Sequence, residues 1–292
     1  MNMHTINTIF FGSSTYSVII LEKLLTLSNF KVVAIVTKPD KVVGRSQKIT
    51  GNPVASFALS HHLPLLQPSC FDPLFIKTYQ KLNPDLALCV AFGPPFFDQK
   101  MIDIPKYKIV NIHPSPLPKY RGATPGPWQI INGQANSSVC FFQIDALPDH
   151  GPIITQVPFD INPTWTSHDF YQHAFDLAAQ NLEKILQSYI NNPLSLTPQD
   201  HSLRSYYPKF TKDTAKIDWS WPVDKIARFV RAMLPWPVAW TQVKNNQDQL
   251  LTMKIFSSQI TNGQFEPLSV QIEAKTKTNW HQIDKYYQII KS

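Results

Sequence analysis

Four short runs of apolar and β-forming residues, separated by helical or loop-like segments, constrain the fold of this 292-residue chain more than any other feature. A helical pattern that places Val18, Leu21 and Leu24 on one stripe separates the first two runs. Strands that alternate with helices pair in parallel through right-handed crossovers. The spacing therefore predicts an α/β domain with a mostly parallel sheet, whose strands include Ile6–Phe11, Lys31–Thr37, Leu86–Phe92 and Ile109–Ile112.

A polar pair ends the fourth run. Asn111 and His113 are two residues apart, so in a strand they point to the same side. They leave the carboxyl end of a core strand, which is where open α/β sheets place their sites. The loop that follows, residues 114–122, contains three prolines, and fixed φ angles make such a loop rigid. Taken alone, the pair is more often a polar strand end whose histidine is satisfied by the backbone.

The whole string N-I-H-P-S-P-L-P-K-Y-R-G-A-T-P, starting at Asn111, closely resembles the signature of the folate-dependent formyltransferases. The resemblance implies a Rossmann-like sheet and formyl transfer from 10-formyltetrahydrofolate without a metal. Asn111 would then donate a hydrogen bond to the oxyanion, and His113 would polarise the formyl oxygen and shuttle the proton. Residues 146–155 resemble the family's Asp-x-Gly segment, so Asp149 would hold the imidazole and favour its charged form.

The same resemblance predicts the donor site. The segment after the third strand, G-P-P-F-F, occupies the position that lines the pterin pocket in the family, with Pro94-Pro95 in place of two aliphatic residues. The folate would also contact the S-P-L-P loop, where Pro116 replaces the common leucine. The predicted cofactor-binding residues are Phe92, Gly93, Ser115, Pro116, Leu117 and Pro118.

The basic segment at residues 38–51 is too long for a plain connection and by itself would be a solvated loop. It resembles the basic insertion of the methionyl-tRNA formyltransferases, which reaches the acceptor end of the tRNA. On that resemblance Arg45 and Lys48 contact phosphates, with help from Lys41. Arg121 either meets an anionic substrate group or forms an ion pair within its own loop, and the sequence leaves these two roles equal.

The carboxyl-terminal part continues the resemblance through P-W-P-V-A-W, residues 235–240. It implies a catalytic domain at residues 1–190, a linker at 191–208 and a basic, tRNA-binding domain at 209–292, a reduced OB-like barrel. Residues 201–292 hold 13 Lys and Arg against 7 Asp and Glu, so they carry +6 of the chain's +7 and suit a polyanionic partner. We also expect a closing helix at Trp280–Ile290, and we expect Trp236, Trp240 and Trp280 to belong to the core.

Other functions stay open. Asp149-His150-Gly151-Pro152 departs from the Asp-Thr-Gly-Asp of the methionyl-tRNA branch and is closer to the glycinamide ribonucleotide branch. The acceptor could thus be a nucleotide-linked aminosugar or another small amine; a formyl-tetrahydrofolate hydrolase and a non-catalytic RNA-binding module are further alternatives. No apolar run approaches membrane-helix length, so we expect a cytoplasmic protein. We also expect the protein to be a monomer. We expect Cys70, Cys89 and Cys140 to be reduced and buried.

Overall fold

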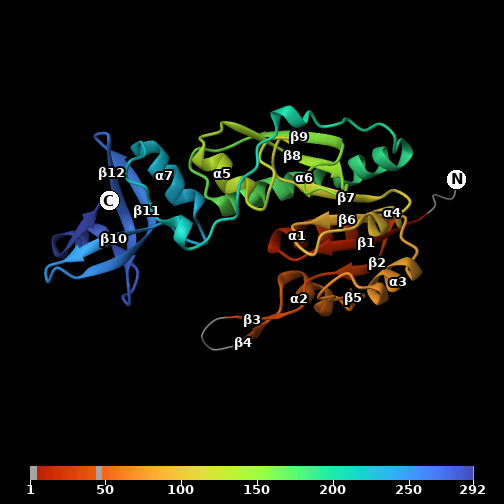
Figure 1. Cartoon of the computed structure of the whole chain (residues 1–292), viewed down its shortest axis with the longest axis horizontal. Coiled ribbons are helices and arrows are strands. Elements are labelled where there is room, and N and C mark those ends of the chain that lie inside the picture. Colours follow the sequence, from red (N-terminus) through yellow and green to blue (C-terminus); the bar gives the residue numbers. More distant parts are fainter. Residues whose placement is uncertain (1–4, 44–47, 292) are drawn as a thin grey trace. The chain divides into compact units, whose positions relative to one another are not determined.

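The computed structural model describes residues 5–43 and 48–291, with the side chains of residues 41–50 left out. These residues form two compact units, coloured along the sequence in Figure 1. The first unit contains the residues up to Arg121 together with Ser138–Phe159 and Gln172–Tyr206. The second contains Gly122–Ser137, Asp160–Tyr171 and the residues from Tyr207 onward.

A seven-stranded sheet forms the centre of the first unit (Figure 1). The pairs from β5 to β7 are parallel, and β8 runs antiparallel to β7. In spatial order the strands are β5 (Leu65–Leu66), β2 (Phe30–Val36), β1 (Ile6–Gly12), β6 (Leu86–Val90), β7 (Ile109–His113), β8 (Asn136–Gln143) and β9 (Ile153–Asp160). Because β6 and β7 are parallel, the loops after them leave the same edge of the sheet.

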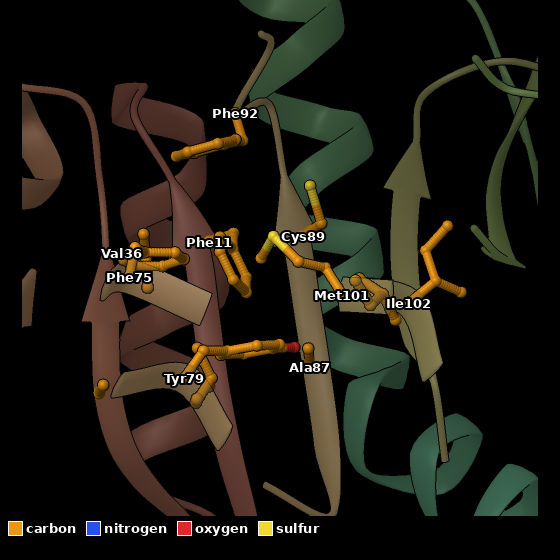
Figure 2. Packing of buried hydrophobic residues seen from close by; sticks show 12 residues of the cluster. Phe11, Val36, Phe75, Tyr79, Ala87, Cys89, Phe92, Met101 and Ile102 are labelled. Carbon is orange, nitrogen blue, oxygen red and sulfur yellow. The ribbon is translucent and has the colours of Figure 1, made fainter. Parts of the chain in front are cut away.

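The core of this unit is aromatic. Phe11 of β1 and Cys89 of β6 lie in one cluster with Phe75 and Tyr79, as Figure 2 shows. Burial of such rings, each contributing roughly 1.5–3 kcal/mol, stabilises the platform that carries the site. The helices are α1 (Thr15–Leu25), α2 (Pro53–Ser60), α3 (Pro73–Lys81), α4 (Gln99–Asp103) and α6 (Ser167–Asn191), with a 3₁₀ turn, η1, at His201–Leu203.

The second unit is built on an antiparallel sheet of five strands. Helix α7 packs against two of these strands, β11 and β12. Its strands, in spatial order, are β13 (Thr278–Asn279), β12 (Gln264–Ile272), β11 (Leu250–Thr261), β10 (Trp240–Asn245) and β14 (Tyr287–Ile290). Its helical elements are α5 (Pro125–Ile131), α7 (Val223–Ala232), η2 (Asp213–Ala215), η3 (Trp280–Gln282) and η4 (Asp284–Tyr286).

The predicted fold class is confirmed: a mixed α/β chain has a mostly parallel main sheet and a separate small antiparallel sheet. The expected long loop at residues 38–51 was wrong in part, because β3 (Lys41–Val43) and β4 (Lys48–Thr50) pair as a short antiparallel ribbon. Backbone pairing satisfies groups that a plain loop would leave to water.

Three smaller expectations were also wrong. Two 3₁₀ turns and β14 take the place of the closing helix expected at Trp280–Ile290. The short Y-Q-I-I sequence forms β14 because it pairs with the otherwise free edge of β10. Cys70 is exposed, whereas Cys89 and Cys140 are buried as expected. Trp236 is 55% exposed and therefore does not belong to the core.

Candidate active site

The predicted polar pair lies at the end of β7, between β6 and β8. Asn111 is in register with Cys89 of β6. His113 is in register with Cys140 of β8 and is 7% exposed. The strand period therefore places an amide and an imidazole together at the carboxyl end of a central strand, as the sequence predicted.

The loop after β7 folds back and holds the imidazole. His113 Nε2 lies 3.0 Å from the carbonyl oxygen of Tyr120. A carbonyl only accepts, so Nε2 carries the hydrogen, and in the neutral ring Nδ1 has the lone pair. The Ser115 hydroxyl donates to the carbonyls of Lys119 and Tyr120, at 2.9 and 3.2 Å, which fixes the same turn. The backbone thus selects the tautomer of the neutral ring.

Asp149 faces the other ring nitrogen. Its Oδ1 lies 3.8 Å from His113 Nδ1, which is an ion-pair distance but longer than a hydrogen bond. The Asp149 side chain is 17% exposed, and its backbone adopts a left-handed φ of 52°. The carboxylate is therefore placed to stabilise a proton on Nδ1. The structure brings together all three of the predicted catalytic residues.

Gly151 keeps Asp149 in place. A Cβ atom at this position would lie 1.9 Å from the carbonyl oxygen of Gln143, so no larger residue fits without a backbone shift. The close approach also allows the Gln143 N–H to donate to the carbonyl of Pro152 at 2.9 Å. The segment that carries Asp149 is therefore attached to the end of β8.

Gln199 is a structural partner of the site that the sequence did not reveal. Its side-chain amide donates to the carbonyls of Asp149 and Gly151, at 3.1 and 2.7 Å. Its oxygen accepts a bond of 2.6 Å from the Arg121 guanidinium. Gln199 is 6% exposed and lies in the segment predicted as a linker, where no motif marks it. It joins the loop of His113 to the loop of Asp149.

Asp149 also affects the pKa values of two buried thiols, those of Cys89 and Cys140. Burial, and then the negative charge of Asp149, raise the pKa of Cys89 to about 12. The same two causes raise the pKa of Cys140. Both groups therefore stay protonated near neutral pH and are poor nucleophiles. The site offers a donor, a base and a carboxylate, which are the groups that acyl transfer to an amine needs.

The predicted folate residues divide into two groups. Side chains of the first group point inward: Phe92 is 2% exposed within the aromatic core (Figure 2), Ser115 is fully buried, and Leu117 packs against Cys140 and Phe142. The second group is accessible to a ligand: Gly93 is exposed with a φ of 68°, and the rings of Pro116 and Pro118 are partly exposed.

Of the predicted tRNA contacts, Arg121 has a described side chain. Arg121 is buried, and its guanidinium donates a hydrogen bond of 2.6 Å to Gln199. Both of its expected roles stay predictions. Lys41 and Lys48 lie in β3 and β4, and their side chains are outside the described residues. Arg45 also lies outside the described residues.

Comparison with known proteins identifies the family. The family described as formyl transferase matches residues 5–186, and its C-terminal domain matches residues 209–283. The chain belongs to the formyl transferase family. The methionyl-tRNA formyltransferase of Alkaliphilus oremlandii is 34% identical over 90% of this chain and 83% of that protein. The one of Chloroflexus aggregans is 36% identical over 80% of this chain and 75% of that protein.

Solved structures share the fold. The methionyl-tRNA formyltransferase from Clostridium thermocellum has a TM-score of 0.60 at 13% identity, covering 92% of this chain and 99% of that one. The N-formyltransferase from Helicobacter canadensis, in complex with folinic acid and dTDP-3-aminofucose, has a TM-score of 0.66 at 23% identity and covers 98% of both chains. No helix within residues 5–43 and 48–291 is long and apolar enough to cross a membrane.

Proposed function

We propose that the protein transfers the formyl group of 10-formyltetrahydrofolate to the amino group of methionyl-initiator tRNA, as a cytoplasmic monomer. One observation supports the chemistry above all others. His113 is held through Nε2 by the Tyr120 carbonyl, so Nδ1 faces Asp149 at 3.8 Å. A base fixed in this way can receive a proton at one defined atom.

Each of the three residues has a part in the transfer. As the amine attacks the formyl carbon, the Asn111 amide donates to the oxygen on which negative charge develops. His113 Nδ1 removes the proton from the attacking nitrogen and delivers it to the departing folate nitrogen. The C–N bond to the acceptor forms and the C–N bond to the donor breaks, with no net proton change. Asp149 stabilises the imidazolium between the two proton transfers.

The surroundings of the site suit the donor. Phe96 on the loop after β6 is 66% exposed, and Leu147 on the loop after β8 is 56% exposed. Exposed apolar side chains such as these can pack against a flat pteridine ring. The donor supplies the activated formyl group, and we propose that Gly93, Pro116 and Pro118 contact it.

The carboxyl-terminal part of the chain suits a polyanionic acceptor. Residues 201–292 carry an excess of six positive charges. Lys225 lies 3.9 Å from the Trp221 ring centroid, and Lys277 lies 4.4 Å from that of Phe256. Lysines beside aromatic rings provide both phosphate neutralisation and stacking surfaces for bases. We therefore propose that residues 209–292 bind the tRNA, with Lys41, Arg45 and Lys48 as further phosphate contacts.

The decisive experiment offers labelled formyl donor with methionyl-initiator tRNA or with aminosugar nucleotides, in separate reactions. We expect label in the tRNA only. Transfer to the aminosugar alone would assign the protein to the small-acceptor branch. Arg45→Ala should raise the KM for tRNA and leave the KM for the donor unchanged. The opposite result would mean that the basic segment at residues 38–51 does not bind the tRNA.

A further inference from the structure

A cavity of about 340 Å³ in the first unit is lined mainly by side chains that carry or can carry positive charge. The lining residues are Arg121, Leu147, Pro148, His150, His201 and Arg204. Two guanidinium groups and two imidazoles converge there on a single space. Such a donor set matches the oxygens of a phosphate or a carboxylate.

Arg121 is 6% exposed, and among the described residues it forms no ion pair with a carboxylate. Its NH2 group contacts Gln199 Oε1 at 2.6 Å and His201 Nδ1 at 2.8 Å. Its Nε has no hydrogen-bond partner among the residues that the structure describes. A buried guanidinium with a donor left over is costly unless another acceptor meets it. The missing acceptor points to a ligand.

The two histidines add donors to the same cavity. Arg121 only donates, so His201 Nδ1 accepts and the neutral ring has its hydrogen on Nε2. His150 Nδ1 lies 2.6 Å from Asp145 Oδ2 and donates to it. The two imidazoles stack with centroids 3.9 Å apart. Burial, and then the positive charges of His150, Arg121 and Arg204, lower the pKa of His201, and the nearby Asp145 carboxylate only partly opposes them.

The cavity is connected to the catalytic carboxylate. Pro148 and His150, which line the cavity, are the chain neighbours of Asp149. Gln199 links the Arg121 guanidinium to the Asp149 carbonyl through one side chain. A ligand that orders Arg121 therefore also orders the backbone of Asp149.

We propose that this cavity binds an oxyanion group of a substrate, either a phosphate of the acceptor or a carboxylate of the folate donor, and thereby positions Asp149. The assignment to these two substrates rests on the proposed function, whereas oxyanion binding itself does not. Leu147 and Pro148 supply an apolar wall for the organic part of the same substrate.

Arg204 is the residue to test, because it is exposed and its substitution should leave the fold intact. Sulfate binding to the full-length protein is measured by titration calorimetry for wild type, for Arg204→Gln and for Lys77→Gln, which removes one exposed charge from α3 of the same unit. Loss of a charge-assisted bond should weaken sulfate binding about 10-fold in Arg204→Gln. Lys77→Gln should bind as wild type does. Equal affinities in all three proteins would overturn the proposal.

Steady-state kinetics with the same variants identify the source of the oxyanion. Acceptor tRNA is compared with and without its 5′-terminal phosphate, and the donor is compared with its pteroate form, which lacks the glutamate. We expect Arg204→Gln to raise the KM of only one of the two substrates, the one that carries the bound oxyanion group. With the form of that substrate that lacks the group, wild type and Arg204→Gln should have the same KM. Unchanged KM values for both substrates would overturn the substrate assignment, even with sulfate binding lost. Absence of tRNA formylation would refute the proposed function and leave the calorimetric result standing.

Discussion

Asp149→Asn is the substitution that tests the mechanism most directly. It keeps the shape of the side chain, and asparagine tolerates the left-handed φ of 52° that the backbone has here. The bonds from Gln199 reach backbone carbonyls, including that of Asp149, so they survive the change. The variant therefore removes one negative charge and keeps these backbone contacts.

The expected loss follows from the geometry. A carboxylate 3.8 Å from a charged imidazole contributes about 4 kcal/mol at an effective dielectric constant of about 20. If this stabilisation exists only while His113 holds the proton, kcat should fall about 10³-fold. KM for either substrate should change little, because the interaction is expected to strengthen only in the transition state.

The assay is single-turnover formyl transfer with saturating donor and acceptor. Asp103→Asn is the control, because Asp103 forms a surface ion pair of 2.7 Å with Lys108 on the same unit. The control should retain wild-type kcat, since exposed pairs contribute little. A kcat within about 3-fold of wild type for Asp149→Asn, where about 10³-fold is expected from the charge, would refute the role of the carboxylate.

Three further predictions concern stability and reactivity. Gly151→Ala should lower the free energy of unfolding by about 1–3 kcal/mol in urea titrations, because the added Cβ would collide with the Gln143 carbonyl. It should also reduce kcat. An unchanged urea midpoint and an unchanged kcat would contradict this contact. A thiol reagent should label Cys70 in the folded protein and Cys89 only after unfolding, as mass spectrometry of the labelled peptides can check. Burial raises the pKa of Tyr189 from 10.0 to about 12, so its contribution to stability is complete below pH 10 and is lost as the pH rises toward 12. Tyr189→Phe should flatten that alkaline decline in urea titrations, and an unaltered slope would exclude this cause.

Predictions from sequence succeeded where the signal was local. The period of a strand placed Asn111 beside His113, and the structure has both on β7. The last strand of the chain was missed because Y-Q-I-I is short, and its choice between helix and strand depends on the free edge of β10, which is distant in sequence.

The sequence by itself determined which chemical groups the protein can use: an amide, an imidazole and a carboxylate, with an α/β sheet to carry them. Only the tertiary structure decided how they are held. The Tyr120 carbonyl fixes the tautomer of His113, and Gln199 joins the loop after His113 to the loop that carries Asp149. These contacts use backbone carbonyls, which every residue has, and a side chain 50 positions from Asp149. Local patterns carry no information on which carbonyl a folded chain will present, so this part of the site required the fold.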